Sequence, residues 1–286
     1  MRIQLKIGVT INPLKTQNHN EQEIAKPRGQ MAYIHINGAD IYYQVYGEDR
    51  PGRVPILLIH GSTNTGANDW SGVAPLLAQE YKVYVPDCRG HGKSNNPPGG
   101  YTFKQMADDA AAFVKAAGYE RMHVIGHSNG GNVAVVTLVE HPEICQTAIP
   151  QAANAYVSDY LREREPIALE PDYYAAHNPQ DVAFMIAEFS EVNGPEYWRE
   201  LLTMTMQEII SEPNYTPEDL ARVKVPVFVI MGSEDRVNAP DKHAQYIAEH
   251  IPASELWIPQ GIGHSVHLEI PEEWTARILD FLNRRG

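Results

Sequence analysis

The sequence is poor in cysteine, in long apolar runs and in positive charge. Cys88 and Cys145 are the two cysteines among 286 residues, which excludes a disulfide framework and a C-x-x-C metal or redox site. We expect both to be buried free thiols. No stretch approaches the roughly 20 consecutive apolar residues of a membrane span. The first 30 residues also lack the apolar core of a signal peptide, so we expect a cytoplasmic protein.

The balance of charge is acidic. The chain has 36 acidic and 23 basic residues, and its formal net charge is −13. An acidic surface repels phosphate backbones, so we expect a small-molecule substrate and no nucleic acid among its partners. The sequence leaves the oligomeric state open, and a homo-oligomer is one of the alternatives.

Familiar motifs for cofactors and metals are missing as well. There is no G-x-G-x-x-G, and the residues GKS at 92–94 match only the end of a phosphate-binding loop, because Asp87 stands where the first glycine belongs. No H-E-x-x-H or cysteine pair accompanies the pattern H-x-x-H-x-E at 264–269. We therefore expect neither a cofactor nor a metal ion.

What the sequence does have is an alternation of short apolar runs with helical patterns. This alternation predicts an α/β fold with a mostly parallel central sheet and helices on both faces. Residues 31–153 and 221–286 would form this core, behind a polar N-terminal extension at residues 1–30. Strands are expected at Tyr33–Ile36, Ile41–Tyr46, Val54–Ile59, Lys82–Val85, Met122–Ile125, Ile144–Pro150, Val225–Met231 and Glu255–Ile258, and helices at Phe103–Ala117, Gly131–Glu140, Ala239–His250 and Glu272–Asn283.

Residues 154–220 differ from this core because they contain no strand-like run. Their helical patterns are rich in aromatic residues and methionine, so we expect a helical lid (cap) inserted over the carboxyl edge of the sheet. Two interpretations of these side chains stay open. They line an apolar substrate pocket, or they form the lid's own core, and for most of them the second is favoured.

The strongest chemical signal is the G-x-S-x-G pattern at Gly126–Gly130. It follows the apolar run MHVI and precedes a helical segment. Glycines on either side leave room for a sharp strand-to-helix turn, which would hold Ser128 in a strained conformation above the sheet. Free N–H groups at the helix N-terminus would face the same space. We predict that Ser128 is a nucleophile; the alternative is an ordinary serine in a packing turn.

A serine nucleophile needs a base. His264 lies in a glycine-rich loop, at residues 261–264, between a predicted strand and the last helix. An imidazole that titrates near pH 6.5 can take and return a proton at neutral pH. We predict that His264 is this base, in preference to His267 three residues later.

Asp235 is the predicted partner of this base. It follows the strand-like run VPVFVIM, and a carboxylate at a strand's carboxyl end can fix the tautomer of the imidazole. We prefer Asp235 to Glu234, which we expect to be solvated. The other place for such an acid, directly after Ile144–Pro150, reads QAANA and contains no carboxylate. The chain order Ser, Asp, His is the one that accompanies this kind of turn.

Two backbone N–H groups are expected to form an oxyanion hole. One belongs to Asn129, the residue after the nucleophile. The other comes from the loop after VPILLI, where we predict the N–H of Ser62, with Thr63 as the alternative. We expect His60 to hydrogen-bond within this loop rather than to take part in the chemistry.

Several of these pieces occur together in one known family. From about residue 31 to 286 the chain resembles the α/β-hydrolase superfamily, and the matching pieces are HG at 60–61, Trp70, DCRGHGKS at 87–94, GHSNGG at 126–131, GSED at 232–235 and GHSVHLEIPEEW at 263–274. Residues 87–94 and PPGGYT at 97–102 are similar to the serine esterase, lactonase and cofactor-free haloperoxidase branch. The resemblance implies a lid between the sixth and seventh strands.

Two features separate the chain from other branches of this superfamily. Ser128 stands where dehalogenases and epoxide hydrolases have aspartate. The loop HGSTNTG at 60–66 is similar to that of the carbon–carbon hydrolases of aromatic degradation, but it lacks their Gly-Pro-Gly continuation.

Together these signals predict a carboxylesterase-like serine hydrolase. Its triad of Ser128, Asp235 and His264 would cleave a small or medium carboxylic ester through an acyl-enzyme intermediate. A lactonase or a carbon–carbon bond hydrolase of the same fold is the alternative. A third hypothesis, from another class, is a non-catalytic ligand receptor that retains the triad.

Overall fold

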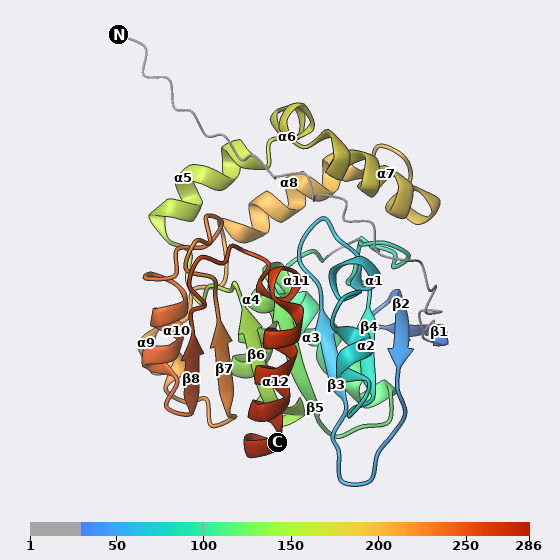
Figure 1. Ribbon diagram of the computed structural model, residues 1–286. Helices are drawn as coiled ribbons and strands as arrows, with labels where there is room; N and C mark the ends of the chain where they lie inside the picture. Colours follow the sequence, from blue (N-terminus) through green and yellow to red (C-terminus); the bar gives the residue numbers. More distant parts are fainter. Residues whose placement is uncertain (1–29, 99) are drawn as a thin grey trace, which may run out of the picture.

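The computed structural model describes residues 30–98 and 100–286 as a twisted sheet flanked by helices (Figure 1). The predicted N-terminal extension, residues 1–30, lies outside the described residues apart from Gln30, where the first strand begins.

An eight-stranded sheet forms the centre of the fold, in the spatial order β1-β2-β4-β3-β5-β6-β7-β8. Its strands are β1 (Gln30–Ile36), β2 (Ala39–Tyr46), β3 (Ile56–Ile59), β4 (Val83–Pro86), β5 (Met122–His127), β6 (Cys145–Gln151), β7 (Val227–Ile230) and β8 (Ser254–Trp257). β2 runs antiparallel to its neighbours β1 and β4, and every pair from β4–β3 to β7–β8 is parallel. The predicted α/β fold class and the mostly parallel sheet are confirmed.

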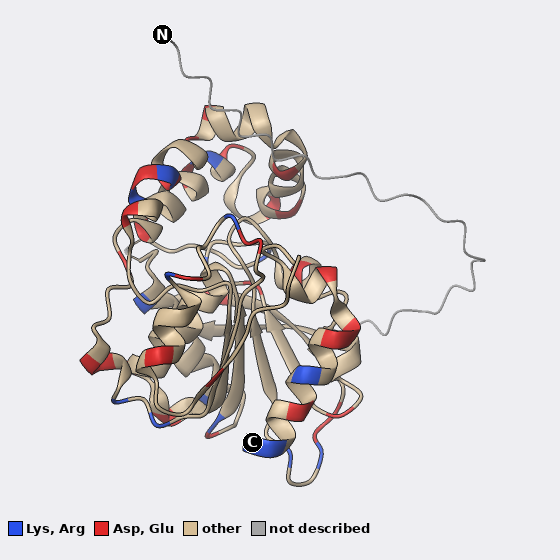
Figure 2. Cartoon of the chain, turned by 60° about the vertical axis from the view of Figure 1, so that its left-hand side comes forward, with Lys and Arg blue, Asp and Glu red and all other residues tan. Residues whose placement is uncertain are grey.

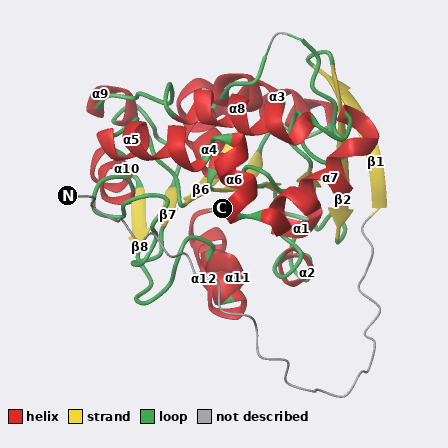
Figure 3. Cartoon of the chain, turned by 90° about the horizontal axis from the view of Figure 1, so that it is seen from above, coloured by secondary structure: helices red, strands yellow, loops and turns green. Residues whose placement is uncertain are grey.

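Helices cover both faces of the sheet, as the view from above shows (Figure 3). One face carries α3 (Phe103–Ala116), α4 (Asn129–Glu140), α9 (Pro217–Leu220) and α10 (Ala244–His250), and the other carries α1 (Gly66–Asp69), α2 (Ala74–Leu77), α11 (Val266–Glu269) and α12 (Pro271–Arg285). A 3₁₀ turn at Pro142–Ile144 leads into β6. Two apolar clusters fill the spaces between the sheet and these two layers.

The central strand β3 explains why a continuous apolar run is needed here. Successive side chains of a strand point to opposite faces. Accordingly, Leu57 and Ile59 join the apolar cluster beneath α3 and α4, whereas Ile56 and Leu58 join the cluster beneath α2 and α12. All four residues are buried, because both faces of a parallel strand are covered.

Most predicted elements are present, with shifted ends. α4 begins at Asn129, two residues before the predicted start, so that it follows Ser128 directly. α10 begins at Ala244 instead of Ala239, because residues 240–243 form turns. The short helices α1, α2 and α11 were not predicted, since a single helical turn shows no periodicity.

Residues 154–220, which we call the insertion, connect β6 to β7 without forming a strand. They contain α5 (Asp159–Ala168), α6 (Pro171–His177), α7 (Pro179–Asn193), α8 (Tyr197–Ile209) and α9. Helices α5 to α8 lie across one end of the sheet, whereas α9 lies beside α10 (Figure 1). The two ends of the insertion meet, because the N–H of Tyr215 donates to the carbonyl oxygen of Ala155 at 2.8 Å.

The insertion has an apolar core of its own. Its buried members are Leu169, Met185, Phe189, Tyr197, Trp198, Leu201 and Leu202. Four of the aromatic and methionine residues noted in the sequence are therefore used to hold α7 and α8 together. This packing favours the second of the two interpretations for these side chains.

Within the described residues, no helix combines the length and the apolar character that crossing a membrane requires.

Figure 2 shows Asp and Glu both on the insertion helices across the end of the sheet and on the helices beside the sheet, so negative charge is not confined to one part of the surface in this view. Both cysteines are free, and Cys145 is buried, whereas Cys88 is half-buried.

A buried ion pair joins the loop after β4 to α3. The Nε and Nη2 of Arg89 donate to the two carboxylate oxygens of Asp109 at 2.8 and 2.9 Å. The amide nitrogen of Asn37, in the β1–β2 turn, donates to the same carboxylate at 2.9 Å. The side chain of Arg89 is 3% exposed, so its charge depends on this partner.

We expect Asp109→Ala to lower the free energy of unfolding by about 3–5 kcal/mol, because it leaves the Arg89 charge buried and unpaired. The control is Asp159→Ala, which removes a carboxylate that is 94% exposed in its pair with Arg162 and should change stability by less than about 1 kcal/mol. Urea unfolding followed by circular dichroism measures both. Equal losses in the two variants would contradict the structural role of the Arg89–Asp109 pair.

Candidate active site

The predicted nucleophile, Ser128, lies between the last residue of β5 and the first residue of α4, with φ 55° and ψ −119°. This conformation is unfavourable for a residue with a side chain, at a cost of roughly 1–3 kcal/mol. The flanking glycines permit the turn. A Cβ at Gly126 would lie 1.9 Å from the Gly130 carbonyl oxygen, and one at Gly130 would lie 2.1 Å from that of Ile59. Neither position can accept a side chain without moving the backbone.

The predicted base and acid are in contact. The Nδ1 of His264 lies 2.9 Å from Oδ2 of Asp235, after β8 and β7 respectively. The other oxygen, Oδ1, accepts the backbone N–H groups of Val237 and Asn238 at 2.8 and 2.9 Å. Burial alone would raise the pKa of Asp235, but the His264 imidazole and these N–H groups bring it below its usual range. An ionised Asp235 holds the proton of His264 on Nδ1 and leaves Nε2 as the acceptor.

The imidazole of His264 lies near the nucleophile turn. Its ring centroid is 5.1 Å from that of His127, the residue directly before Ser128. Within the described residues, neither the Ser128 hydroxyl nor Nε2 of His264 takes part in a hydrogen bond. Bonds of this kind are often loose before a substrate is bound. The structure thus brings the three predicted residues to one end of the sheet, with Nε2 and the hydroxyl unengaged.

The predicted oxyanion donors face the same end of the sheet. Asn129 is the first residue of α4, so its backbone N–H has no acceptor inside the helix. The loop after β3 approaches the turn closely, since a Cβ at Gly61 would lie 3.3 Å from the Cβ of Ser128. In the described part of the chain the N–H groups of Ser62 and Thr63 make no hydrogen bond, so both alternatives for the second donor remain.

His60 is held within its loop. Its Nδ1 lies 2.7 Å from the carbonyl oxygen of Gly61, and its Nε2 accepts the N–H of Cys88 at 2.8 Å. Both ring nitrogens are therefore used in fixing the loop.

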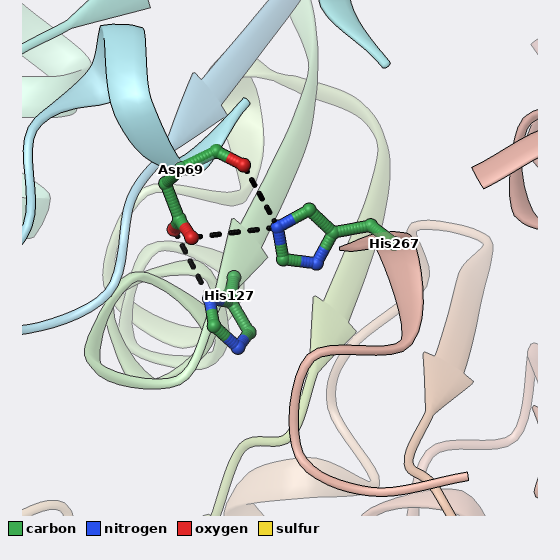
Figure 4. A group of neighbouring side chains, drawn as sticks. All are labelled: Asp69, His127 and His267. Carbon is green, nitrogen blue, oxygen red and sulfur yellow. Dashed lines mark hydrogen bonds and ion pairs between the residues drawn. The ribbon is translucent and has the colours of Figure 1, made fainter. Parts of the chain in front are cut away.

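A second carboxylate–histidine contact, which sequence reasoning missed, lies beneath this site. Oδ2 of Asp69 accepts the N–H of Gly61 at 2.9 Å and lies 3.0 Å from Nδ1 of His127. The carbonyl oxygen of Asp69 lies 3.0 Å from Nε2 of His267 (Figure 4). Asp69 is 1% exposed. One residue therefore contacts the loop after β3, the nucleophile turn and helix α11, which directly follows the loop that carries His264.

The proton positions in this cluster follow from its hydrogen bonds. The indole N–H of Trp274 donates to Oε1 of Gln151 at 2.6 Å, which leaves the Gln151 amide NH₂ to donate to Nδ1 of His267 at 2.7 Å. His267 must then carry its proton on Nε2 and donate to Asp69. His267 is fully buried and committed on both nitrogens, so it differs from the half-exposed His264.

Asp69, His127 and His267 bring one ligand atom each within 4.8 Å of one another, which is close enough to consider a metal ion. A metal-bound imidazole nitrogen must be free of its proton. Nε2 of His267 carries one, and Oδ2 of Asp69 is already an acceptor for Gly61. The donor set therefore suits a hydrogen-bond network and does not fit a metal ion.

Helix α5 of the insertion adds a second missed residue, Glu165, which is 4% exposed. Burial raises its pKa, and the nearby charges of Arg164 and His264 act in the opposite direction. Glu165 therefore lies within electrostatic reach of the predicted base. The hydroxyl of Tyr160, on the same helix, donates to the carbonyl oxygen of Arg236, directly after Asp235. These contacts fix α5 above the Asp235–His264 pair.

We expect Asp69→Asn to lower the free energy of unfolding at pH 7 by about 3 kcal/mol, because an amide cannot accept all the donors that surround this carboxylate. Burial opposes the effect, but His127 and His267 hold the pKa of Asp69 well below its usual range. Its stabilising contribution is therefore full above about pH 5 and is lost as the pH falls through the lowered pKa.

The unfolding free energy of the wild type should consequently fall more steeply between pH 5 and pH 3 than that of Asp69→Asn. Urea titrations at four pH values measure the slopes, with the exposed Asp241→Asn as the matched control. Parallel slopes for the wild type and Asp69→Asn would show that the carboxyl group has an ordinary pKa.

Comparison with known proteins agrees with this architecture. A family model described as "alpha/beta hydrolase fold" matches residues 54–185. The 2-hydroxy-6-oxo-6-(2'-aminophenyl)hexa-2,4-dienoic acid hydrolase of Metapseudomonas resinovorans is 26% identical, over 93% of this chain and 97% of the relative. The serine hydrolase BPHL of Mus musculus is 25% identical, over 88% of this chain and 86% of the relative.

Solved structures resemble the chain over most of its length. Est816, described as an N-acyl homoserine lactone degrading enzyme, matches with a TM-score of 0.71 and 27% identity, over 87% of this chain and all of the other. The CarC serine hydrolase of carbazole degradation matches with a TM-score of 0.73 and 24% identity, over 90% of this chain and all of the other. The sheet order, the strand-to-helix turn at Ser128 and these likenesses show that the chain has the α/β-hydrolase fold.

Proposed function

We propose that this chain is a serine hydrolase of the carboxylesterase kind, which cleaves a small or medium carboxylic ester through an acyl-enzyme intermediate. The observation that carries the proposal is the Asp235–His264 pair, 2.9 Å between oxygen and Nδ1, beside the strained turn of Ser128. A carboxylate, an imidazole and a hydroxyl in this order form the arrangement that activates serine.

The proposed reaction has two halves. Nε2 of His264 takes the hydroxyl proton of Ser128 as the oxygen attacks the ester carbonyl, and it then gives that proton to the leaving alcohol. Backbone N–H groups of Asn129 and Ser62 stabilise the oxyanion, each by roughly 3–4 kcal/mol. A water molecule, activated by His264, then releases the acid and restores Ser128. Asp235 keeps its charge throughout and orients the imidazole.

The division into a core, 31–153 and 221–286, and a lid, 154–220, is part of this proposal. Contacts from α5 to the loop after β7, and from α8 to Asn129, support a lid that covers the reacting groups. Such a cover would exclude bulk water and limit the size of the substrate.

A lactone is the second candidate substrate. It is favoured by the likeness to Est816, described as degrading N-acyl homoserine lactones, at 27% identity. A lactone is an internal ester, so the same groups would open it by the same steps. The carbon–carbon hydrolase alternative draws its support from the relative named 2-hydroxy-6-oxo-6-(2'-aminophenyl)hexa-2,4-dienoic acid hydrolase, at 26% identity.

We expect the wild type to hydrolyse 4-nitrophenyl esters of short and medium chain length, and Ser128→Ala to be inactive on all of them. Both proteins are also assayed on a panel of lactones. In a separate experiment, a fluorophosphonate probe should label the wild type and not the variant. Turnover of lactones alone would replace the esterase by a lactonase. A folded wild type that neither turns over nor reacts with the probe would favour the receptor hypothesis.

We expect Asp235→Asn to lower kcat on the best ester by about 10⁴-fold, because an amide at this position stabilises the wrong tautomer of His264. The matched control is Glu234→Gln, since Glu234 is exposed and next in sequence, and it should change kcat less than about twofold. Thermal unfolding of both variants shows whether the fold is kept. A kcat of Asp235→Asn within tenfold of the wild type would remove Asp235 from the proposed triad.

A further inference from the structure

A carboxyl group that the reaction above does not use is buried beside the nucleophile turn. Glu208 lies near the end of α8 and is 3% exposed. Its Oε2 accepts the side-chain amide of Asn129 at 3.4 Å, and Asn129 directly follows Ser128. Within the described residues, Glu208 forms no ion pair with Lys, Arg or His. A buried carboxylate without a nearby cation is energetically costly, so the protonated, neutral form of the acid is favoured.

The surroundings of Glu208 favour its neutral form. Burial, and then the negative charge of Glu212, raise its pKa well above the usual range. The loop after β4 contributes the thiol of Cys88, and the segment before α3 contributes the phenol of Tyr101. The pKa of each of these two groups is raised by burial and by negative charge that includes Glu208. No neighbour among these groups supplies positive charge.

The hydrogen bond to Asn129 shows which oxygen of the neutral acid carries the proton. Oε2 is an acceptor, so it is the carbonyl oxygen, and Oε1 is the hydroxyl. Oε1 is buried and has no hydrogen-bond partner. A buried donor without an acceptor costs about 1–3 kcal/mol, and a ligand oxygen that meets it would recover this cost.

Other buried polar groups lie between the loop after β4 and the insertion. His91 is fully buried and stacks on Tyr101, with ring centroids 6.0 Å apart, and contacts Phe189 of α7 edge-on at 5.9 Å. Its Nδ1 lies 3.0 Å from the Arg89 carbonyl oxygen, so Nε2 is an acceptor, and it has no partner. The hydroxyl of Tyr197, on α8, is also buried, and it lies within hydrogen-bonding reach of the Asn96 side chain. Nε2 of His91 and Oε1 of Glu208 are thus buried polar atoms without a hydrogen-bond partner among the described residues.

We propose that Glu208, as a neutral acid, is a substrate-binding residue whose Oε1 hydroxyl donates to an oxygen atom of the acyl group, so that the enzyme prefers oxygen-bearing acyl groups to plain hydrocarbon ones. The inference rests on the proposed function and narrows its substrate class. It also changes the expectation of an apolar acyl pocket, because several aromatic side chains of the insertion are used in its own core.

The test uses two pairs of 4-nitrophenyl esters that differ by one ether oxygen in place of a methylene, methoxyacetate with butanoate and 3-methoxypropanoate with pentanoate. The readout is the ratio of kcat/KM within each pair, compared between proteins, so that the intrinsic reactivity of each ester cancels. We expect Glu208→Leu to lower this ratio about three- to tenfold in at least one pair, since it removes one neutral hydrogen bond. Glu208→Gln should keep the ratio, because its amide also donates.

The matched control is Glu200→Leu, an exposed position on the same helix, which should leave both ratios unchanged. Unchanged ratios in Glu208→Leu would overturn the inference, and so would equal losses in Glu208→Gln and Glu208→Leu, because the group would then act as an anion. A wild type that cleaves none of the four esters would refute the proposed function, and the substrate class would fall with it. If the wild type cleaves the esters but substitution of Glu208 leaves the kcat/KM ratios unchanged, only the proposed substrate class would be refuted.

The neutral state has its own readout in the stability of the fold. A carboxyl with a raised pKa contributes full stability below its unfolded pKa, and this contribution is lost as the pH rises through its folded pKa. From pH 5 to pH 8 the wild type should therefore lose unfolding free energy relative to Glu208→Gln, measured in urea. A constant difference between the two proteins over this range would contradict the neutral acid.

Discussion

The carboxylate of Asp69 is the contact on which the geometry of the candidate site depends. The carboxylate of Asp69 contacts the loop after β3 and the nucleophile turn, and its main-chain carbonyl oxygen contacts His267 in α11, 198 residues further along the chain and directly after the loop that carries His264. Each loop is irregular backbone at the end of a strand, and such segments have few regular hydrogen bonds to hold them in place. A buried acceptor at their meeting point replaces those bonds. The sheet determines where each loop begins, and the contacts of Asp69 hold the segments together where they meet.

Sequence patterns were sufficient for the fold because the fold depends on local signals. Apolar runs of four to seven residues marked the eight strands, and helical spacing marked α3, whose start is capped in the structure by the Thr102 hydroxyl, which accepts the N–H of Gln105. The pattern failed where elements are a single turn long, as in α1 and α11. It also misplaced the start of α10, because composition alone does not separate a turn from the first turn of a helix.

In the candidate site too, residues with a local sequence signal could be predicted and residues without one could not. Ser128, Asp235 and His264 could be predicted because each follows a strand-like run in a recognisable loop, and the structure brings them to one end of the sheet. Asp69 and Glu208 carry no such signal. Their partners lie 58 and 79 residues away, and an isolated acidic residue in a helical pattern usually indicates a solvated face. Only the packed structure shows that both are buried and what surrounds them.

The insertion leaves and rejoins the core at one neck, where Tyr215 donates to Ala155. Its helices also pack on a nucleus of their own. Substitutions within that nucleus, or changes in the length of α6 and α7, can therefore accumulate over generations without disturbing the sheet or the loops that Asp69 holds. In such an architecture substrate range can diverge rapidly between descendants while the bond-breaking apparatus is inherited intact.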